Sequence, residues 1–70
     1  MKNEIEHMQV RLFRLAWKKW NITLQRCSDI FDLFGVDDYI ESLYGLFHVQ
    51  GDEANLCEIE EYLKNKGVTI

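Results

Sequence analysis

The chain has 70 residues, of which 47% are apolar and 13% aromatic, and it carries a formal net charge of −4. This length allows a single domain, and the apolar content is too high for an intrinsically disordered chain. The negative net charge argues against general nucleic-acid binding, because phosphate contacts require positive charge that is either net or locally concentrated.

Charge is unevenly distributed along the sequence. Between residues 11 and 26 there are five basic residues and no acidic residue. Between residues 29 and 61 there are ten acidic residues and no lysine or arginine. The first third of the chain is therefore basic, and most of the remainder is acidic.

The first residues and the cysteines bear on the cellular compartment. Glu4 and Glu6 stand where a signal peptide would carry basic residues followed by an apolar run. No stretch approaches the roughly 20 apolar residues that cross a bilayer. We therefore expect a cytoplasmic protein without membrane contact, in which Cys27 and Cys57 are reduced.

Residues 3–20 predict the first and longest helix. With successive side chains about 100° apart, the polar face consists of Glu4, His7, Arg11, Arg14 and Lys18. The apolar arc opposite covers about 220°, roughly twice the width that a surface helix needs. This helix is expected either at the centre of the domain or covered on its second side by something else.

A second helix is expected over residues 24–34. The hydroxyl of Thr23 is suited to accept a hydrogen bond from a free backbone N–H at the start of this helix. Gly35 directly follows the helix and can adopt the left-handed conformation that closes a helix. Residues 38–48 predict a third helix, capped by Asp37 or Asp38.

The last third contains a turn and a final helix. Residues 50–52 form the turn, and the final helix is expected over 58–66, ending at Gly67. Residues 53–57 fit either a short extended segment or the entry to this helix. The sequence thus predicts a compact all-α bundle of about four short helices in one domain, residues 1–70.

The aromatic pattern of the third and last helices resembles a family of short bacterial proteins known only as a domain of unknown function. The residues that carry the resemblance are Tyr39-Ile40, Tyr44, Leu46-Phe47-His48, Gly51, Ile59-Glu60-Glu61-Tyr62-Leu63-Lys64 and Gly67. It covers approximately residues 8–68. Genes of this family often lie beside genes for ADP-ribosyltransferase-like proteins, so the resemblance implies a small neutraliser of an adjacent toxin, with no established activity.

The residues that could carry catalysis or bind a metal form no recognised site. A catalytic His48 would need a nucleophile and an orienting group within reach, and neither Cys27 nor Cys57 forms a known local signature. The alternative is a structural role for His48 in the turn at Gly51. A zinc site that combined these residues with His7 would lack any paired ligand spacing. We therefore predict no catalytic residue, no metal and no cofactor.

Val10, Phe13, Trp17 and Trp20 are the candidate partner-binding residues. Tryptophan is enriched among the residues that dominate interface affinity, and these side chains widen the apolar arc of the first helix. Core packing is the equal alternative, because a small domain has few aromatic residues to spare.

Arg11, Arg14 and Lys18 form the candidate charged surface. This stripe could be a solvated face, could pair with acids of the same domain, or could contact a charged protein or DNA. The function we expect is a non-enzymatic interaction module whose partner is a second copy or a co-encoded protein, such as an ADP-ribosyltransferase-like toxin. The alternative is a small DNA-binding regulator that uses this stripe. Neither a membrane nor a small-molecule substrate is expected as a partner.

Overall fold

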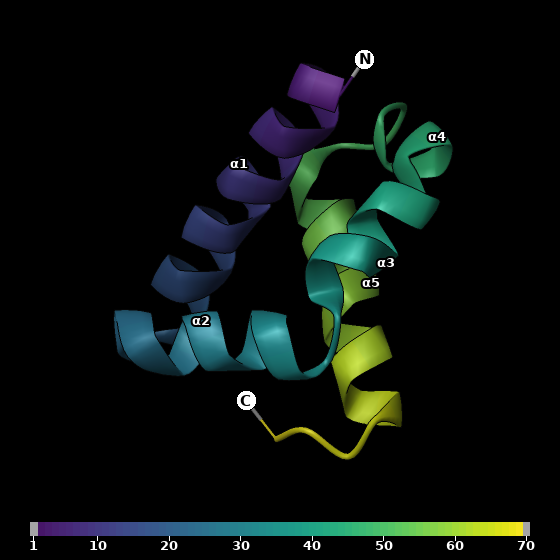
Figure 1. The fold of residues 1–70 in the computed structure, drawn as a ribbon. Helices are drawn as coiled ribbons and strands as arrows, with labels where there is room; N and C mark the ends of the chain where they lie inside the picture. Colours follow the sequence, from purple (N-terminus) through teal and green to yellow (C-terminus); the bar gives the residue numbers. More distant parts are fainter. Residues whose placement is uncertain (1, 70) are drawn as a thin grey trace.

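The computed structural model describes residues 2–69, and within that range it contains five helices and no strand. The helices are α1 (Lys2–Trp20), α2 (Leu24–Leu33), α3 (Val36–Ser42), α4 (Tyr44–Phe47) and α5 (Asp52–Asn65). In Figure 1, α1 lies along one side of the molecule, and α3, α4 and α5 lie on the other side. Helix α2 runs across the C-terminal end of α1. The expected all-α fold is confirmed, with one more helix than predicted.

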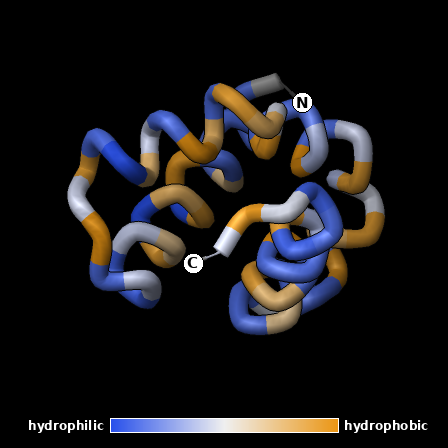
Figure 2. The backbone as a smooth tube through the Cα atoms, turned by 90° about the horizontal axis from the view of Figure 1, so that it is seen from below, coloured by the Kyte–Doolittle hydropathy of each residue, from blue (hydrophilic) through white to orange (hydrophobic). Residues whose placement is uncertain are grey.

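Every helix contributes to one core. The buried apolar residues are Met8, Leu12, Ala16, Cys27, Ile30, Phe31, Val36, Ile40, Phe47, Leu56, Ile59 and Leu63. Figure 2 shows the corresponding alternation of hydrophobic and hydrophilic segments along the helices. Because α1 contacts α2, α3 and α5, it is the element around which the other helices are arranged.

The apolar arc of α1 is only partly buried. Its buried residues, Met8, Leu12 and Ala16, follow one another at four-residue spacing, which places them on a single stripe. Val10 and Trp17 lie outside this stripe and are 53% and 40% exposed. One side of the wide apolar arc therefore faces the core, and part of the other side faces solvent.

The ends of α2 agree with the prediction. The hydroxyl of Thr23 accepts a hydrogen bond from the Arg26 amide at 3.1 Å, as expected for an N-cap. Gly35 has a φ of 62°, in the left-handed region that favours glycine. Tyr62 of α5 donates a hydrogen bond to the Phe34 carbonyl at 2.6 Å, so this helix end is also fixed by a tertiary contact.

The single helix predicted over residues 38–48 is wrong, because the structure has two helices separated at Leu43. The backbone of Leu43 has φ −109° and ψ 18°, outside the helical region. The Ser42 hydroxyl donates to the Tyr39 carbonyl at 2.9 Å, a local bond that competes with regular helix geometry. Gly45 further lowers the helix propensity. The predicted aspartate cap is also wrong, since the N-cap is Gly35 and no side chain caps α3.

Residues 53–57 are helical, so the extended alternative is wrong and α5 begins six residues before the predicted start, at Asp52. Asn55 explains this early start. Its side chain is fully buried, and both the nitrogen and the oxygen of its amide make hydrogen bonds. Its Nδ2 donates to the Phe47 carbonyl at 2.9 Å, and its Oδ1 accepts from Gln50 Nε2 at 2.8 Å. These bonds attach the first turn of α5 to the end of α4.

Candidate protein-interaction groove

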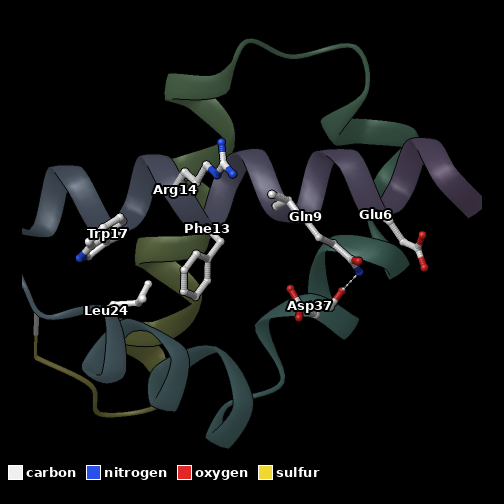
Figure 3. Close-up of a pocket in the computed structure, with 8 residues that line it drawn as sticks. Glu6, Gln9, Phe13, Arg14, Trp17, Leu24 and Asp37 are labelled. Carbon is white, nitrogen blue, oxygen red and sulfur yellow. Dashed lines mark hydrogen bonds between the residues drawn. The ribbon is translucent and has the colours of Figure 1, made fainter.

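An open groove runs between α1 and the adjoining parts of α2 and α3 (Figure 3). Its volume is about 590 Å³. The lining residues are Glu6, Gln9, Val10, Phe13, Arg14 and Trp17 of α1, Leu24 of α2 and Asp37 of α3. We refer to this feature as the α1–α3 groove.

One end of the α1–α3 groove is apolar. Trp17 and Leu24 are 40% and 54% exposed at this end, and Val10, which lies between Gln9 and Phe13 on α1, is 53% exposed along the same groove. Phe13 is half-buried beside them, and its ring meets Phe31 of the core edge-to-face at a centroid distance of 4.9 Å. Figure 3 shows Phe13 pointing from α1 into the gap above α2. The apolar end thus has a floor packed on the core and solvent-facing walls.

The other end of the groove is polar. Gln9 Nε2 donates to the backbone carbonyl of Asp37 at 2.9 Å and so connects α1 to α3. That bond uses the Asp37 backbone, and within residues 3–69 the Asp37 carboxylate itself has no hydrogen bond or ion pair. Partial burial, together with the carboxylates of Asp32 and Asp38, raises the pKa of Asp37 above its ordinary value. Glu6 lines the same end (Figure 3).

The four candidate partner-binding residues separate into two groups. Val10, Phe13 and Trp17 line the groove, whereas Trp20 lies elsewhere. The Trp20 indole N–H donates to Glu60 Oε2 at 2.8 Å, and its ring lies 6.4 Å from that of Phe31. Trp20 therefore joins α1 to α5, and only three of the four residues form one surface.

The basic stripe is partly neutralised by acids of α5. Arg11 Nε lies 3.1 Å from Asp52 Oδ1. The neighbouring Lys19 lies 3.1 Å from Glu60 Oε2, and the hydrogen bond and charge of Glu60 raise the pKa of Lys19. Arg14 and Lys18 are exposed, with no ion pair inside residues 3–69. The part of the stripe nearest α5 therefore fits the alternative in which basic residues pair with acids of the same domain.

His48 lies at the end of α4 and is exposed. Its ring stacks on Tyr44 with a centroid distance of 5.6 Å and an interplanar angle of 14°. The side-chain hydrogen bonds of the turn before Gly51 come from Gln50 and Asn55 and not from the imidazole. The residue that fixes the turn is therefore Asn55, which the sequence pattern did not indicate.

The two cysteines lie in different environments. Cys27 is buried, its Sγ lies 3.8 Å from the Phe13 carbonyl oxygen, and burial raises its pKa to about 11. Cys57 is exposed on α5. Across residues 2–69, no three histidine, cysteine or acidic side chains are grouped as metal ligands would be.

A family model described as a protein of unknown function (DUF3791) matches residues 4–66. The chain belongs to this family. The DUF3791 match includes every residue of the α1–α3 groove as well as Asn55, and the family resemblance expected from the sequence is thereby confirmed. No curated protein and no solved structure matches the chain.

Four groove residues of this DUF3791 protein were in neither predicted site: Glu6, Gln9, Leu24 and Asp37. Leu24 belongs to the apolar pattern of α2, but as its first residue it projects beyond the core. Asp37 was interpreted as a helix cap, and its carboxylate instead borders the groove. The signal that could have found Leu24 is its position one residue after Thr23, where a helix has just begun. No sequence signal places Asp37 beside α1.

None of the helices within residues 2–69 combines the length and the apolar character needed to span a bilayer.

Proposed function

We propose that this DUF3791 protein is a non-enzymatic interaction module that binds a protein partner in the α1–α3 groove. The observation that carries the proposal is that Val10, Trp17 and Leu24, all exposed, line one groove together with Phe13. Single exposed apolar residues are ordinary on protein surfaces, but apolar patches with a polar rim are typical of binding sites. Here the rim is supplied by Glu6, Arg14 and Asp37.

The core does not require these side chains. Among residues 3–69, twelve apolar residues form the buried core, and Val10, Trp17 and Leu24 are not among them. Because Trp17 keeps 40% of its surface exposed, a partner that covered it would gain apolar burial worth about 25 cal/mol for each Å² removed from water. The exposed tryptophan supports an interface role over a packing role.

In its most concrete form, the proposed partner is an ADP-ribosyltransferase-like protein encoded beside this one, which the small protein would neutralise. The support for this form is the family resemblance and its implied gene neighbourhood. The α1–α3 groove offers a surface through which such a protein could be held. Occlusion of a partner's active site by a small bound domain would require no catalytic residue of its own.

The alternative role in DNA binding has weaker support. Arg11 and Lys19 each lie 3.1 Å from a carboxylate oxygen of α5, so part of their positive charge is already compensated. Only Arg14 and Lys18 of the stripe remain for phosphate contacts, and each such contact contributes to a steep salt dependence. An absence of salt-sensitive DNA binding at low ionic strength would remove this alternative.

The proposed function is tested by co-expressing the tagged protein with its neighbouring genes and measuring retention of the co-purified partner. The variant Trp17→Ala with Leu24→Ala should weaken the complex by about 2 kcal/mol or more, roughly thirtyfold in Kd. The matched control is Leu33→Ala with Val49→Ala, which removes two side chains that are 77% and 75% exposed outside the groove. Equal retention of the partner by both double variants would contradict the proposal.

A further inference from the structure

We propose that the protein partner places an aspartate or glutamate side chain between Arg14 and Lys18, with a neighbouring apolar side chain packed on Trp17 and Ile22. The site is an open hollow next to the α1–α3 groove, and we refer to it as the Arg14–Lys18 hollow. Its lining residues are Arg14, Trp17, Lys18, Asn21 and Ile22. The proposal rests on the proposed function and adds to it the chemistry of the bound segment.

The Arg14–Lys18 hollow is continuous with the α1–α3 groove, because Arg14 and Trp17 line both. Residues three or four positions apart lie next to each other on a helix surface, so Arg14 borders Trp17 and Lys18. Figure 3 shows the Arg14 guanidinium pointing away from Asp37 and Leu24. A segment bound in the groove can therefore pass along Trp17 and reach both cations.

The charges of the Arg14–Lys18 hollow are all positive. No acidic residue is among its described lining, and the sequence has none between residues 11 and 26. Arg11 and Lys19, the cations on either side along α1, each lie 3.1 Å from a carboxylate oxygen of α5. Inside residues 3–69, Arg14 and Lys18 make no such ion pair. The acids of α5 thus neutralise the outer cations and leave the two inner ones for a carboxylate from outside the chain.

A carboxylate between Arg14 and Lys18 would remove an unfavourable interaction. The two residues stand four positions apart, the spacing at which like charges on a helix repel each other. One carboxylate could accept charge-assisted hydrogen bonds from both side chains. The partial negative charge at the C-terminal end of a helix acts within its last turn, which contains Lys18 but not Arg14. Arg14 should therefore contribute more of the attraction than Lys18.

Apolar surface lies directly beside these cations. Trp17 is 40% exposed, and Ile22 is partly buried against the core. The chain turns at Asn21, whose φ of 54° is in the left-handed region, and Ile22 follows this turn into the same hollow as Trp17. The arrangement fits an acidic side chain with an apolar neighbour.

A protein segment fits this surface better than a nucleic acid does. A nucleic-acid strand carries a negative charge at every nucleotide. A strand that continued from the hollow into the α1–α3 groove would bring further phosphates against Glu6 and Asp37, and like-charge juxtaposition costs binding energy. A peptide carries charge only where its acidic residue stands. The net charge of −4 also opposes the approach of a polyanion.

The proposal is tested with a phage-displayed library of random peptides selected on the immobilised full chain. Among peptides whose binding is lost with Trp17→Ala, we expect aspartate or glutamate to be enriched beside apolar residues. Such peptides should bind Arg14→Gln with Lys18→Gln about three- to tenfold more weakly than the unchanged protein at low salt. The matched control is Arg26→Gln with Lys64→Gln, which makes the same charge change at exposed positions outside the hollow.

A charge exchange tests the attraction in the opposite direction. Arg14→Glu with Lys18→Glu should bind lysine-substituted versions of the selected peptides at least about threefold more tightly than the unchanged protein does. Trp17-dependent peptides without acidic enrichment, equal binding to the neutralised and control variants, or no gain on charge exchange would overturn this proposal and leave the proposed function intact. A selection that yields no Trp17-dependent peptide would count against both.

Nucleic acid and a second copy of the chain are distinguished by two further measurements. A fluorescent oligothymidine strand should bind the unchanged protein no more tightly than it binds Arg14→Gln with Lys18→Gln at low salt. Oligonucleotide binding that this variant loses would assign the hollow to nucleic acid and overturn the proposal. Self-association in sedimentation that is lost in the same variant would assign the hollow to a second copy, with the same consequence.

Discussion

Asn55 is the buried polar residue on which the junction between α4 and α5 depends. Both ends of its amide are used, by the Phe47 carbonyl and by the Gln50 side chain. A buried polar group that loses its partner costs the full penalty of its removal from water, which exceeds the net gain from making the bond. The junction is therefore sensitive to a single side chain.

Replacing Asn55 with alanine should lower the free energy of unfolding by about 1–3 kcal/mol, because the Phe47 carbonyl would be left without this donor. Urea denaturation followed by circular dichroism measures the change. Asn65→Ala near the other end of α5 is the control, since Asn65 is exposed and its removal should change stability by less than about 0.5 kcal/mol. Equal effects of the two substitutions would show that the amide of Asn55 does not hold the junction.

The raised pKa of Asp37 makes the free energy of unfolding depend on pH. Its folded-state pKa is raised, so the folded chain binds the proton more tightly than the unfolded chain, and stability falls as pH rises through this range. Asp37→Asn should therefore be more stable at pH 7 than Asp38→Asn, by up to about 0.5 kcal/mol. Both residues lie in the first turn of α3, so the comparison cancels the effect of the helix dipole.

The difference between these two variants should shrink toward pH 3, where aspartate is protonated in either state. Thermal unfolding at a series of pH values provides the measurement. A difference that grew as the pH fell would have the wrong sign for a raised pKa and would contradict the environment assigned to Asp37.

At the scale of the element, α1 has two different apolar sides. Trp20 donates a hydrogen bond to Glu60 and packs near Phe31, so it belongs to the contact between α1 and α5. Trp17, three residues earlier, faces the groove and is 40% exposed. One helix thus combines a packing tryptophan and a solvent-facing tryptophan within a single turn.

Trp20→Ala should lower the free energy of unfolding by about 2–4 kcal/mol, because it removes a large packed ring and its hydrogen bond. Trp17→Ala should lower it by less than about 1 kcal/mol, since an exposed side chain contributes little packing. Chemical denaturation of the two single variants tests the pair directly. Comparable destabilisation by both would mean that Trp17 is a core residue, and the groove would lose its main apolar anchor.

The helix ends that could be predicted are those with a local cause. Thr23 and Gly35 act on their immediate neighbours, and both positions agree with the sequence pattern. The start of α5 depends on Asn55 reaching the Phe47 carbonyl, eight residues earlier, and no local pattern records that contact. The apolar width of α1 predicted either a central helix or one covered on its second side by something else. The identity of its neighbours did not follow, because Asp37 is brought beside α1 by the chain path through α2.

At the scale of the whole molecule, charge is balanced on one side and unbalanced on another. Arg11 and Lys19 of α1 meet acids of α5, which satisfies part of the segregation visible in the sequence. The region around Asp37 has no such basic neighbour within residues 29–61. Within residues 3–69, the folded chain therefore places its two ion pairs along the α1–α5 contact, whereas Glu6, Arg14 and Asp37 line the groove without an ion pair.

The separation of the groove from the core has an evolutionary consequence. Because Val10, Trp17 and Leu24 lie outside the buried cluster, substitutions there change little of the folding free energy. For the proposed interaction, sequence drift at these positions would alter which partner is recognised while the fold persists. If the groove is the proposed binding surface, the limit on divergence at these positions is set by binding and not by folding.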